Sequence, residues 1–316
     1  MRAECHPLQP IDLSEVLVRA RWQIPPERVE GRSAIVDHPT DPRLALRAKG
    51  IAWTDPSGRV HPPSARSWFF DGRRPWLSCH VTPAGWVEGR PTEDRAVGAM
   101  PLARVDAEIQ ATNRLRRAGI AVSTPVGRGL YPGLTFGGES LGFLVFVEPR
   151  GLRRIGFDIA ERGLTHPDTR RDLVEVGALL RRIHRAGLVD ISPHLGNFSR
   201  TDGVLRAHDL DRWRAAEELT PAQVRAYRLR DTAIVGWSLS RRSYRPESVH
   251  ARHTLAGDVM AGYLGDRTKV AEIRAVELIR FVRMLREGGD IRDVTGTWSE
   301  LVSETVDQDA GMVTGC

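Results

Sequence analysis

The segment Gly177–Trp213 gathers the residue types that could do chemistry, in the order GALLRRIHRAGLVDISPHLGNFSRTDGVLRAHDLDRW. An apolar helical stretch ends at His184, and the loop that follows contains Asn197. Two short apolar runs around Thr201-Asp202-Gly203 then predict a hairpin that leads to Asp209. The hairpin brings a side-chain amide and a carboxylate together. Both are oxygen ligands of the kind that a hard cation such as Mg²⁺ takes.

Each of these two residues also has an ordinary structural interpretation. Asn197 precedes Phe198 and could cap a turn, while Asp209 could be solvated beside His208. The order and spacing of the helix end, the loop and the hairpin together favour a site.

The same segment resembles the catalytic core of bacterial kinase-like phosphotransferases of the aminoglycoside phosphotransferase and lipopolysaccharide kinase type. In that family an apolar helix ends in L-H-x-x-G, a loop reads H-G-D-x-H-x-G-N, and a hairpin leads to D-F-[DG]. The resemblance implies an α+β bilobal kinase-like fold that uses ATP and magnesium, with Asn197 and Asp209 as the metal ligands. The residues at or near the matching places are Leu180, His184, Gly187, His194, Gly196, Asn197 and Asp209-Leu210-Asp211.

The catalytic loop departs from that family pattern. Ser192 stands five residues before Asn197, where the family has the aspartate that orients the acceptor hydroxyl, and Asp190 replaces the family histidine. A serine cannot act as that carboxylate base. Either Asp190 takes the role, in a catalytic loop with Ser192 and His194, or the chain is a weak kinase or a pseudokinase. Loss of the base would lower the rate without excluding nucleotide binding, because loose phosphoryl transfer depends mainly on positioning and electrostatics.

Kinases also use a strand lysine that contacts the phosphates and pairs with a helix glutamate. The stretch from Leu102 to Gly119 predicts a helix that carries Glu108, and Lys49 follows the apolar run LALRA. Lys49 with the downstream Asp71-Gly72 also resembles the selenoprotein O family of kinase-like AMP transferases. Lys49 and Glu108 are the expected pair, and an exposed strand-end lysine is the alternative for Lys49.

The remaining elements predict a β-rich N-lobe, residues 1–147, and a mainly helical C-lobe, residues 148–316. Short apolar pieces broken by Pro and Gly from Arg32 to Arg90 indicate strands. The run Leu141–Val147 predicts a buried strand, and Phe143–Glu148 is expected to be the hinge, which places Glu148 at the nucleotide. The N-lobe would bind nucleotide, and the C-lobe would hold the catalytic loop, the metal and the acceptor.

Composition limits the partners. The net charge is +6, the basic charge comes almost wholly from arginine, and acidic residues are interspersed, so nucleic acid is not an expected partner. Cys5, Cys79 and Cys316 are too few and too far apart for a disulfide framework. No signal peptide is evident, and no apolar run reaches the roughly 20 residues that span a bilayer. We therefore expect a cytoplasmic protein.

Three functions follow from these patterns. The favoured one is an ATP- and magnesium-dependent phosphotransferase that acts on a small-molecule or peptide hydroxyl, by analogy in a biosynthetic pathway. The second is a pseudokinase that works as a scaffold for a partner protein. The third, implied by the resemblance to selenoprotein O, is transfer of AMP rather than phosphate.

Overall fold

The computed structural model describes residues 33–49, 53–54, 60–61, 76–82, 85–92, 100–136, 138–189, 191, 193–211, 213–238 and 249–265. The chain divides into two compact units. The first unit consists of Met1–Val105 and Thr124–Arg150, and the second of Asp106–Ser123 and Gly151–Cys316.

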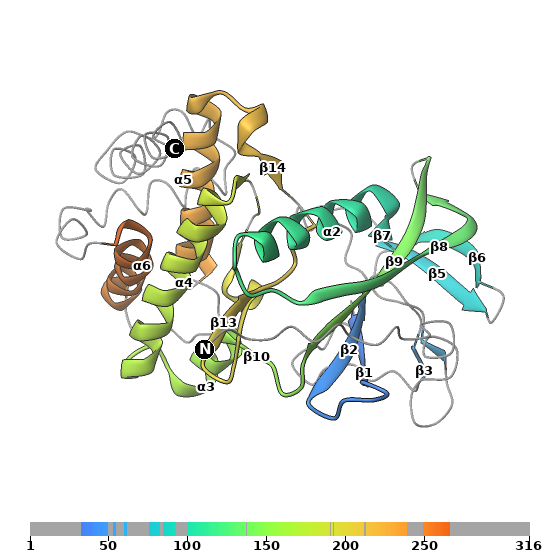
Figure 1. The fold of residues 1–316 in the computed structure, drawn as a ribbon, viewed down its shortest axis with the longest axis horizontal. Coiled ribbons are helices and arrows are strands. Elements are labelled where there is room, and N and C mark those ends of the chain that lie inside the picture. Colours follow the sequence, from blue (N-terminus) through green and yellow to red (C-terminus); the bar gives the residue numbers. More distant parts are fainter. Residues whose placement is uncertain are drawn as a thin grey trace. The chain divides into compact units, whose positions relative to one another are not determined.

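An antiparallel sheet forms the first unit (Figure 1). Its strand order is β1-β2-β9-β7, and β8 also pairs with β9. The short apolar pieces predicted the strands, and the run predicted as a buried strand lies within β9. Two further hairpins join β3 to β4 and β5 to β6. The bounds are β1 Ser33–Asp37, β2 Leu44–Lys49, β3 Trp53–Thr54, β4 Val60–His61, β5 Trp76–Thr82, β6 Gly85–Thr92, β7 Met100–Pro101, β8 Thr124–Phe136 and β9 Glu139–Pro149.

The pairing of β2 with β9 determines which side chains share a face of this sheet. Leu46 lies opposite Val147, and Ala48 opposite Val145, and all four are buried. Because side chains alternate along a strand, Lys49 lies on the other face. The same face carries Arg47 and Glu148, and these two side chains and that of Lys49 are all buried.

Helices dominate the second unit (Figure 1). With the β-rich first unit they give the α+β fold that the sequence predicted. Most of α2 belongs here, and its bounds confirm the helix predicted from Leu102. The helices are α2 Leu102–Arg117, α3 Ile155–Arg162, α4 Pro167–Arg185, α5 Pro221–Ser238 and α6 Val249–Leu264, with short 3-10 turns η1 Leu195–Asn197 and η2 Ala216–Glu218.

Two small sheets complete the second unit. The first joins β10, β12 and β13, and the second joins β11 and β14. Their bounds are β10 Arg153–Arg154, β11 Leu188–Val189, β12 Phe198–Thr201, β13 Val204–Ala207 and β14 Arg214–Ala215. The predicted C-lobe is mainly helical, and its residues 239–248 and 266–316 lie outside the described residues.

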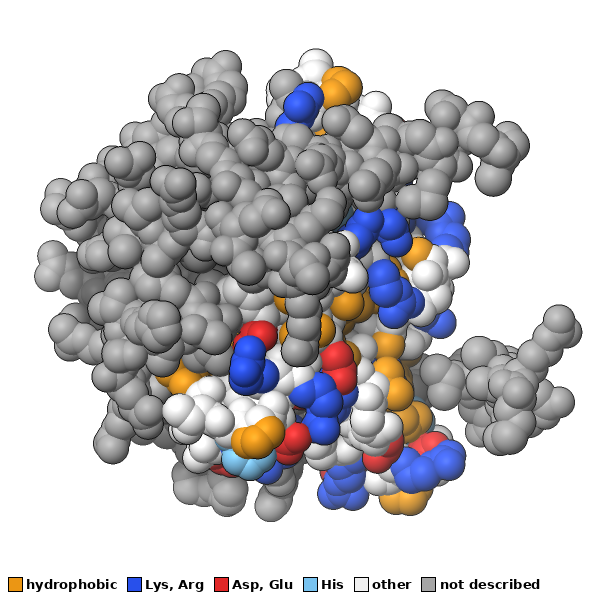
Figure 2. Space-filling view, turned by 90° about the vertical axis from the view of Figure 1, so that its left-hand side faces the viewer, with side chains coloured by type: hydrophobic (Ala, Val, Ile, Leu, Met, Phe, Trp, Pro, Cys, Tyr) orange, Lys and Arg blue, Asp and Glu red, His pale blue; other side chains and the backbone are white. Residues whose placement is uncertain are grey.

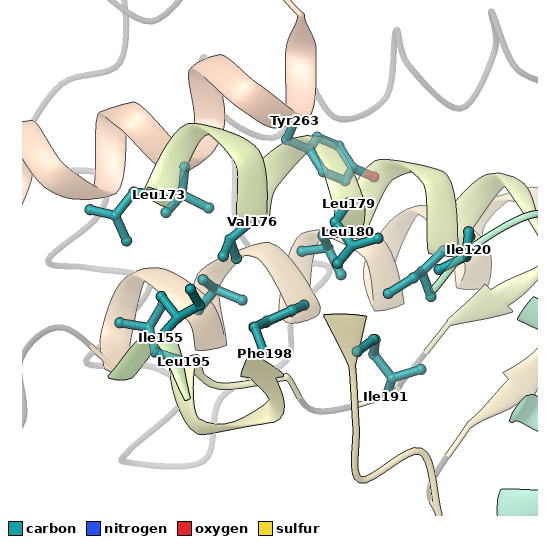
Figure 3. Packing of buried hydrophobic residues seen from close by; sticks show 14 of the residues in the cluster. Ile120, Ile155, Leu173, Val176, Leu179, Leu180, Ile191, Leu195, Phe198 and Tyr263 are labelled. Carbon is teal, nitrogen blue, oxygen red and sulfur yellow. The ribbon is translucent and has the colours of Figure 1, made fainter. Parts of the chain in front are cut away.

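Helix α4 is the centre of the second unit. It starts with a proline in its first turn and with His166 as a cap, whose ring nitrogen accepts from the Asp168 amide at 3.2 Å. The apolar positions Leu173, Val176 and Leu180, at helical spacing, are fully buried. Figure 3 shows them together with Leu195 of η1 and Phe198 of the hairpin. The core of this unit therefore packs directly beneath the predicted site.

Two glycines allow α4 and α6 to cross closely. A methyl group on Gly177 would overlap the carbonyl oxygen of Val259, and one on Gly262 would overlap that of Val174. Figure 3 shows the result, with Tyr263 of α6 lying over α4 beside Leu180.

The surface agrees with the interspersed charge pattern of the sequence. On the face drawn in Figure 2, basic and acidic side chains of the described residues lie next to one another. Within the described ranges, no helix has both the length and the apolar character that a bilayer crossing demands.

Candidate functional site

The hairpin β12–β13 belongs to the three-stranded sheet of the second unit. Asn197 and Asp209 both lie at the open end of this hairpin. Phe198 pairs with Ala207 at the open end of the hairpin. One residue further on, the backbone amide of His208 donates to the carbonyl oxygen of Asn197 at 2.8 Å. Asn197 therefore takes part in this backbone contact, and Asp209 directly follows its partner His208 in the chain.

Asn197 is held in η1 with 7% of its surface exposed. Its side-chain oxygen Oδ1 is buried and accepts no hydrogen bond from the described part of the chain. A buried acceptor without a donor is costly, so an atom of this kind in a native fold calls for an explanation such as a bound ion.

His194 performs the capping role that the sequence left open for Asn197. Its Nδ1 accepts a hydrogen bond from the amide of Gly196 at 3.0 Å and so caps η1. Nδ1 of His194 therefore has a structural role in this loop. The catalytic role predicted for His194 stays a prediction.

Asp209 adopts a left-handed backbone, with φ of 55°. A non-glycine residue in this region is uncommon, and such strained positions often occur at functional sites. Its carboxylate is mostly buried, with 12% of the side chain exposed, and Asp211, two residues further on, is buried too. The solvated interpretation of Asp209 beside His208 is therefore wrong.

Arg154 is a site residue that the sequence did not indicate. It is buried, its Nη1 donates to the carbonyl of Gly196, and the same nitrogen lies 3.8 Å from Oδ2 of Asp209. It reaches this position because β10 pairs with β12, which sets Arg154 opposite Ser199. This position depends on long-range strand pairing, so no local pattern could have revealed it.

These donor types fit magnesium bound together with a nucleotide. Mg²⁺ usually takes one or two protein oxygens and completes its shell with water and phosphate oxygens. Asn197 and Asp209 would supply one amide and one carboxylate oxygen. Among the described residues no cluster of three or more His, Cys, Asp and Glu could hold a metal.

Asp190 and Ser192 lie outside the described residues, but Ile191 between them is anchored. The amide of Ile191 donates to Oδ2 of Asp231 on α5 at 3.2 Å. The same oxygen lies 3.2 Å from Nε2 of His184, and Nδ1 of His184 lies 2.7 Å from the hydroxyl of Tyr263. The side chains of His184, Asp231 and Tyr263 are fully buried. His184, in the last turn of α4, is a core residue, because its ring reaches partners on two other helices.

In the first unit, Lys49 ends β2 and is only 6% exposed. The alternative of an exposed strand-end lysine is therefore wrong. Glu108 lies in α2, within the second unit, and is also buried. The pairing of Lys49 with Glu108 stays a prediction.

Glu148 lies near the end of β9, and its side chain is held inside the first unit. Nε of Arg47 donates to Oε1 at 2.7 Å and to Oε2 at 2.8 Å, and both side chains are buried. Arg47, on the same strand face as Lys49, was missed, because its partner is 101 positions away. Glu148 was predicted to end a hinge whose backbone contacts adenine. That role stays a prediction.

Solved structures of kinases are among the proteins to which this chain is similar. No family model matches it, and no curated protein matches it. Among solved structures, WaaP in complex with acyl carrier protein is 17% identical, with 93% of this chain and 91% of that chain covered and a TM-score of 0.41. A glucosamine kinase is 15% identical, with coverage of 93% and 96% and a TM-score of 0.32. The Mycobacterium tuberculosis PknI kinase domain is 14% identical, with coverage of 92% and 94% and a TM-score of 0.35.

The kinase resemblance stated from the sequence thus recurs among solved structures. At these identities and TM-scores such likenesses concern the fold at most. The case for the site rests on the residues of this chain.

Proposed function

We propose that this protein is an ATP- and magnesium-dependent phosphotransferase that acts on a hydroxyl of a small molecule or a peptide. The proposal is carried by the buried Oδ1 of Asn197, which accepts no hydrogen bond from the described residues, and by Asp209, which follows the backbone partner of Asn197 and has a left-handed backbone. An amide and a carboxylate oxygen in this arrangement suit a magnesium ion that bridges nucleotide phosphates.

In the proposal each residue has a defined task. Asn197 and Asp209 hold the magnesium, which when bound would neutralise charge on the phosphates. Lys49 contacts the phosphates, and Glu108 orients its ammonium group. The backbone up to Glu148 reads the adenine. Residues 1–147 would then serve as the nucleotide lobe and 148–316 as the catalytic lobe.

The acceptor side depends on the loop around Ile191. Asp190 is proposed to accept the hydroxyl proton of the acceptor, with Ser192 and His194 in the same loop. Asp231, by holding the amide of Ile191, fixes the residue between Asp190 and Ser192. A nucleotide and the acceptor are the proposed partners, and the cytoplasm is the proposed compartment.

Ser192 favours a second candidate function, a pseudokinase that keeps the nucleotide site and regulates a partner protein. Absence of the usual aspartate would leave nucleotide binding intact while transfer is lost.

The deciding experiment uses ATP labelled at the γ- or the α-phosphate, with purified protein and candidate acceptors. Label from γ-ATP on the acceptor supports a kinase, and label from α-ATP identifies an AMP transferase. Replacement Asp190→Asn should lower γ-transfer by roughly two to four decades while MgATP binding persists. If wild type binds MgATP but transfers neither label, and Ser192→Asp restores transfer, the pseudokinase alternative holds. If wild type binds no MgATP, both candidates fail.

A further inference from the structure

Arg154 touches both chain segments that carry the proposed metal ligands. It lies at the end of β10, immediately before α3, and its side chain is 7% exposed. Its Nη1 donates to the carbonyl of Gly196, the residue before Asn197, and lies 3.8 Å from Oδ2 of Asp209. A buried permanent cation thus stands directly at the proposed metal site.

Such a cation changes what the site can bind. Arginine keeps its charge at every accessible pH, so it cannot neutralise itself when a metal ion approaches. An arginine beside an aspartate also repels other cations that approach that carboxylate. A divalent ion meets the same repulsion with twice the charge. The negative phosphates of a nucleotide reverse this effect, because they attract both the metal ion and the guanidinium.

We infer that Arg154 makes metal binding at Asn197 and Asp209 conditional on a nucleoside polyphosphate. This inference rests on the proposed function and adds the order of binding to it. Bare Mg²⁺ binds poorly, and the metal enters together with the polyphosphate. Arg154 is a positioning and gating residue here, because it also holds the Gly196 carbonyl that precedes Asn197.

The test uses Mn²⁺, which takes the same oxygen ligands and is followed by electron paramagnetic resonance. Its affinity is measured for the full chain with and without ATP. Arg154→Gln and Arg154→Met remove the charge, and Arg154→Lys keeps it. The matched control is Arg153→Gln, which removes a neighbouring charge that pairs instead with Asp158 at 2.9 Å and with Glu161. Circular dichroism checks that each variant folds.

The charge-removing variants should bind Mn²⁺ alone about tenfold more tightly than wild type, whereas Arg154→Lys and Arg153→Gln should stay near wild type. Unchanged or weaker Mn²⁺ binding in both folded charge-removing variants would overturn the inference. If neither variant folds, wild type decides: binding of Mn²⁺ alone more tightly than about 1 mM counts against the inference, and weaker binding supports it. The proposed function fails separately, if Asp209→Asn leaves Mn²⁺-ATP binding unchanged.

Discussion

The backbone amide of His208 donates to the carbonyl oxygen of Asn197 at 2.8 Å. This bond continues the β12–β13 ladder by one step beyond Phe198 and Ala207. The chain then turns into the left-handed conformation at Asp209, which changes the direction of the backbone immediately after the ladder. The metal-binding geometry proposed here therefore depends on a hairpin whose register is fixed by backbone contacts.

Asp209→Ala should abolish metal-dependent nucleotide binding, because it removes the carboxylate ligand. Asp202 provides a matched control, since it is also an aspartate in the left-handed region, with φ of 50°, but lies at the hairpin turn. Both variants place alanine at a strained position and should lose about 1 kcal/mol of stability. Calorimetric titration with ATP, with and without magnesium, separates them. Equal loss of binding in both variants would mean that strain, and not the carboxylate, explains the effect.

Asn197→Ala should remove nucleotide binding at little cost in stability. Its Oδ1 accepts no hydrogen bond from the described residues, so loss of the amide removes a buried unsatisfied acceptor. The free energy of unfolding should change by less than about 1 kcal/mol, while Mg²⁺-dependent ATP affinity falls at least tenfold. Urea denaturation and calorimetry provide the two measurements. A large loss of stability with ATP affinity retained would mark Asn197 as a purely structural residue.

The sequence predicted those features that depend on local pattern. The spacing of apolar residues in α4 and the turn signal at Asp202-Gly203 located the helix and the hairpin, whereas the convergence of the Asn197 and Asp209 side chains on a metal stays a prediction. Arg154, Arg47 and Asp231 were missed, because each acts through a contact made only after distant segments fold together. A buried arginine or aspartate resembles a surface one until its partner is known.

Asp231→Ala should destabilise the second unit strongly. It leaves the Ile191 amide and the His184 ring without the acceptor Oδ2, and both residues are buried. Buried groups that lose a partner cost about 1–3 kcal/mol each, so a total of about 2–5 kcal/mol is expected. Asp258→Ala is the control, because its partner Arg170 is half exposed and can be hydrated when released. Chemical denaturation should show a clearly larger loss for Asp231→Ala, and similar losses would contradict this account.

Glu217 should contribute a pH-dependent increment of stability. A hydrogen bond from Arg114 holds the pKa of its carboxyl below the ordinary value of 4.5. A lowered folded-state pKa means that the unfolded chain binds the proton more readily, so this stability is present above pH 4.5 and is lost as the pH falls through the folded-state pKa. Glu217 is largely exposed, so the increment should stay below about 1 kcal/mol. Thermal melts of wild type and Glu217→Gln should differ at pH 7 and converge in acid. A constant difference between the two proteins would refute the linkage.

Lys49 and Glu108 should show energetic coupling in nucleotide binding. Both side chains are buried, and a buried lysine needs a counter-charge to remain protonated. Lys49→Met and Glu108→Gln should each weaken MgATP binding. If Glu108 acts by orienting the ammonium, the double variant should lose less than the sum of the single losses, with a coupling of about 0.5–3 kcal/mol.

Arg47→Lys is the control for this cycle, because Arg47 lies on the same face of β2 but holds Glu148. Loss of the contact that Nε makes with both oxygens of that carboxylate should lower stability while MgATP affinity stays within about threefold of wild type. Calorimetry of the four proteins of the cycle gives the coupling energy directly. Additive losses for Lys49 and Glu108 would show that they do not act as a pair, and unchanged MgATP affinity in Lys49→Met would remove this lysine from the phosphate site.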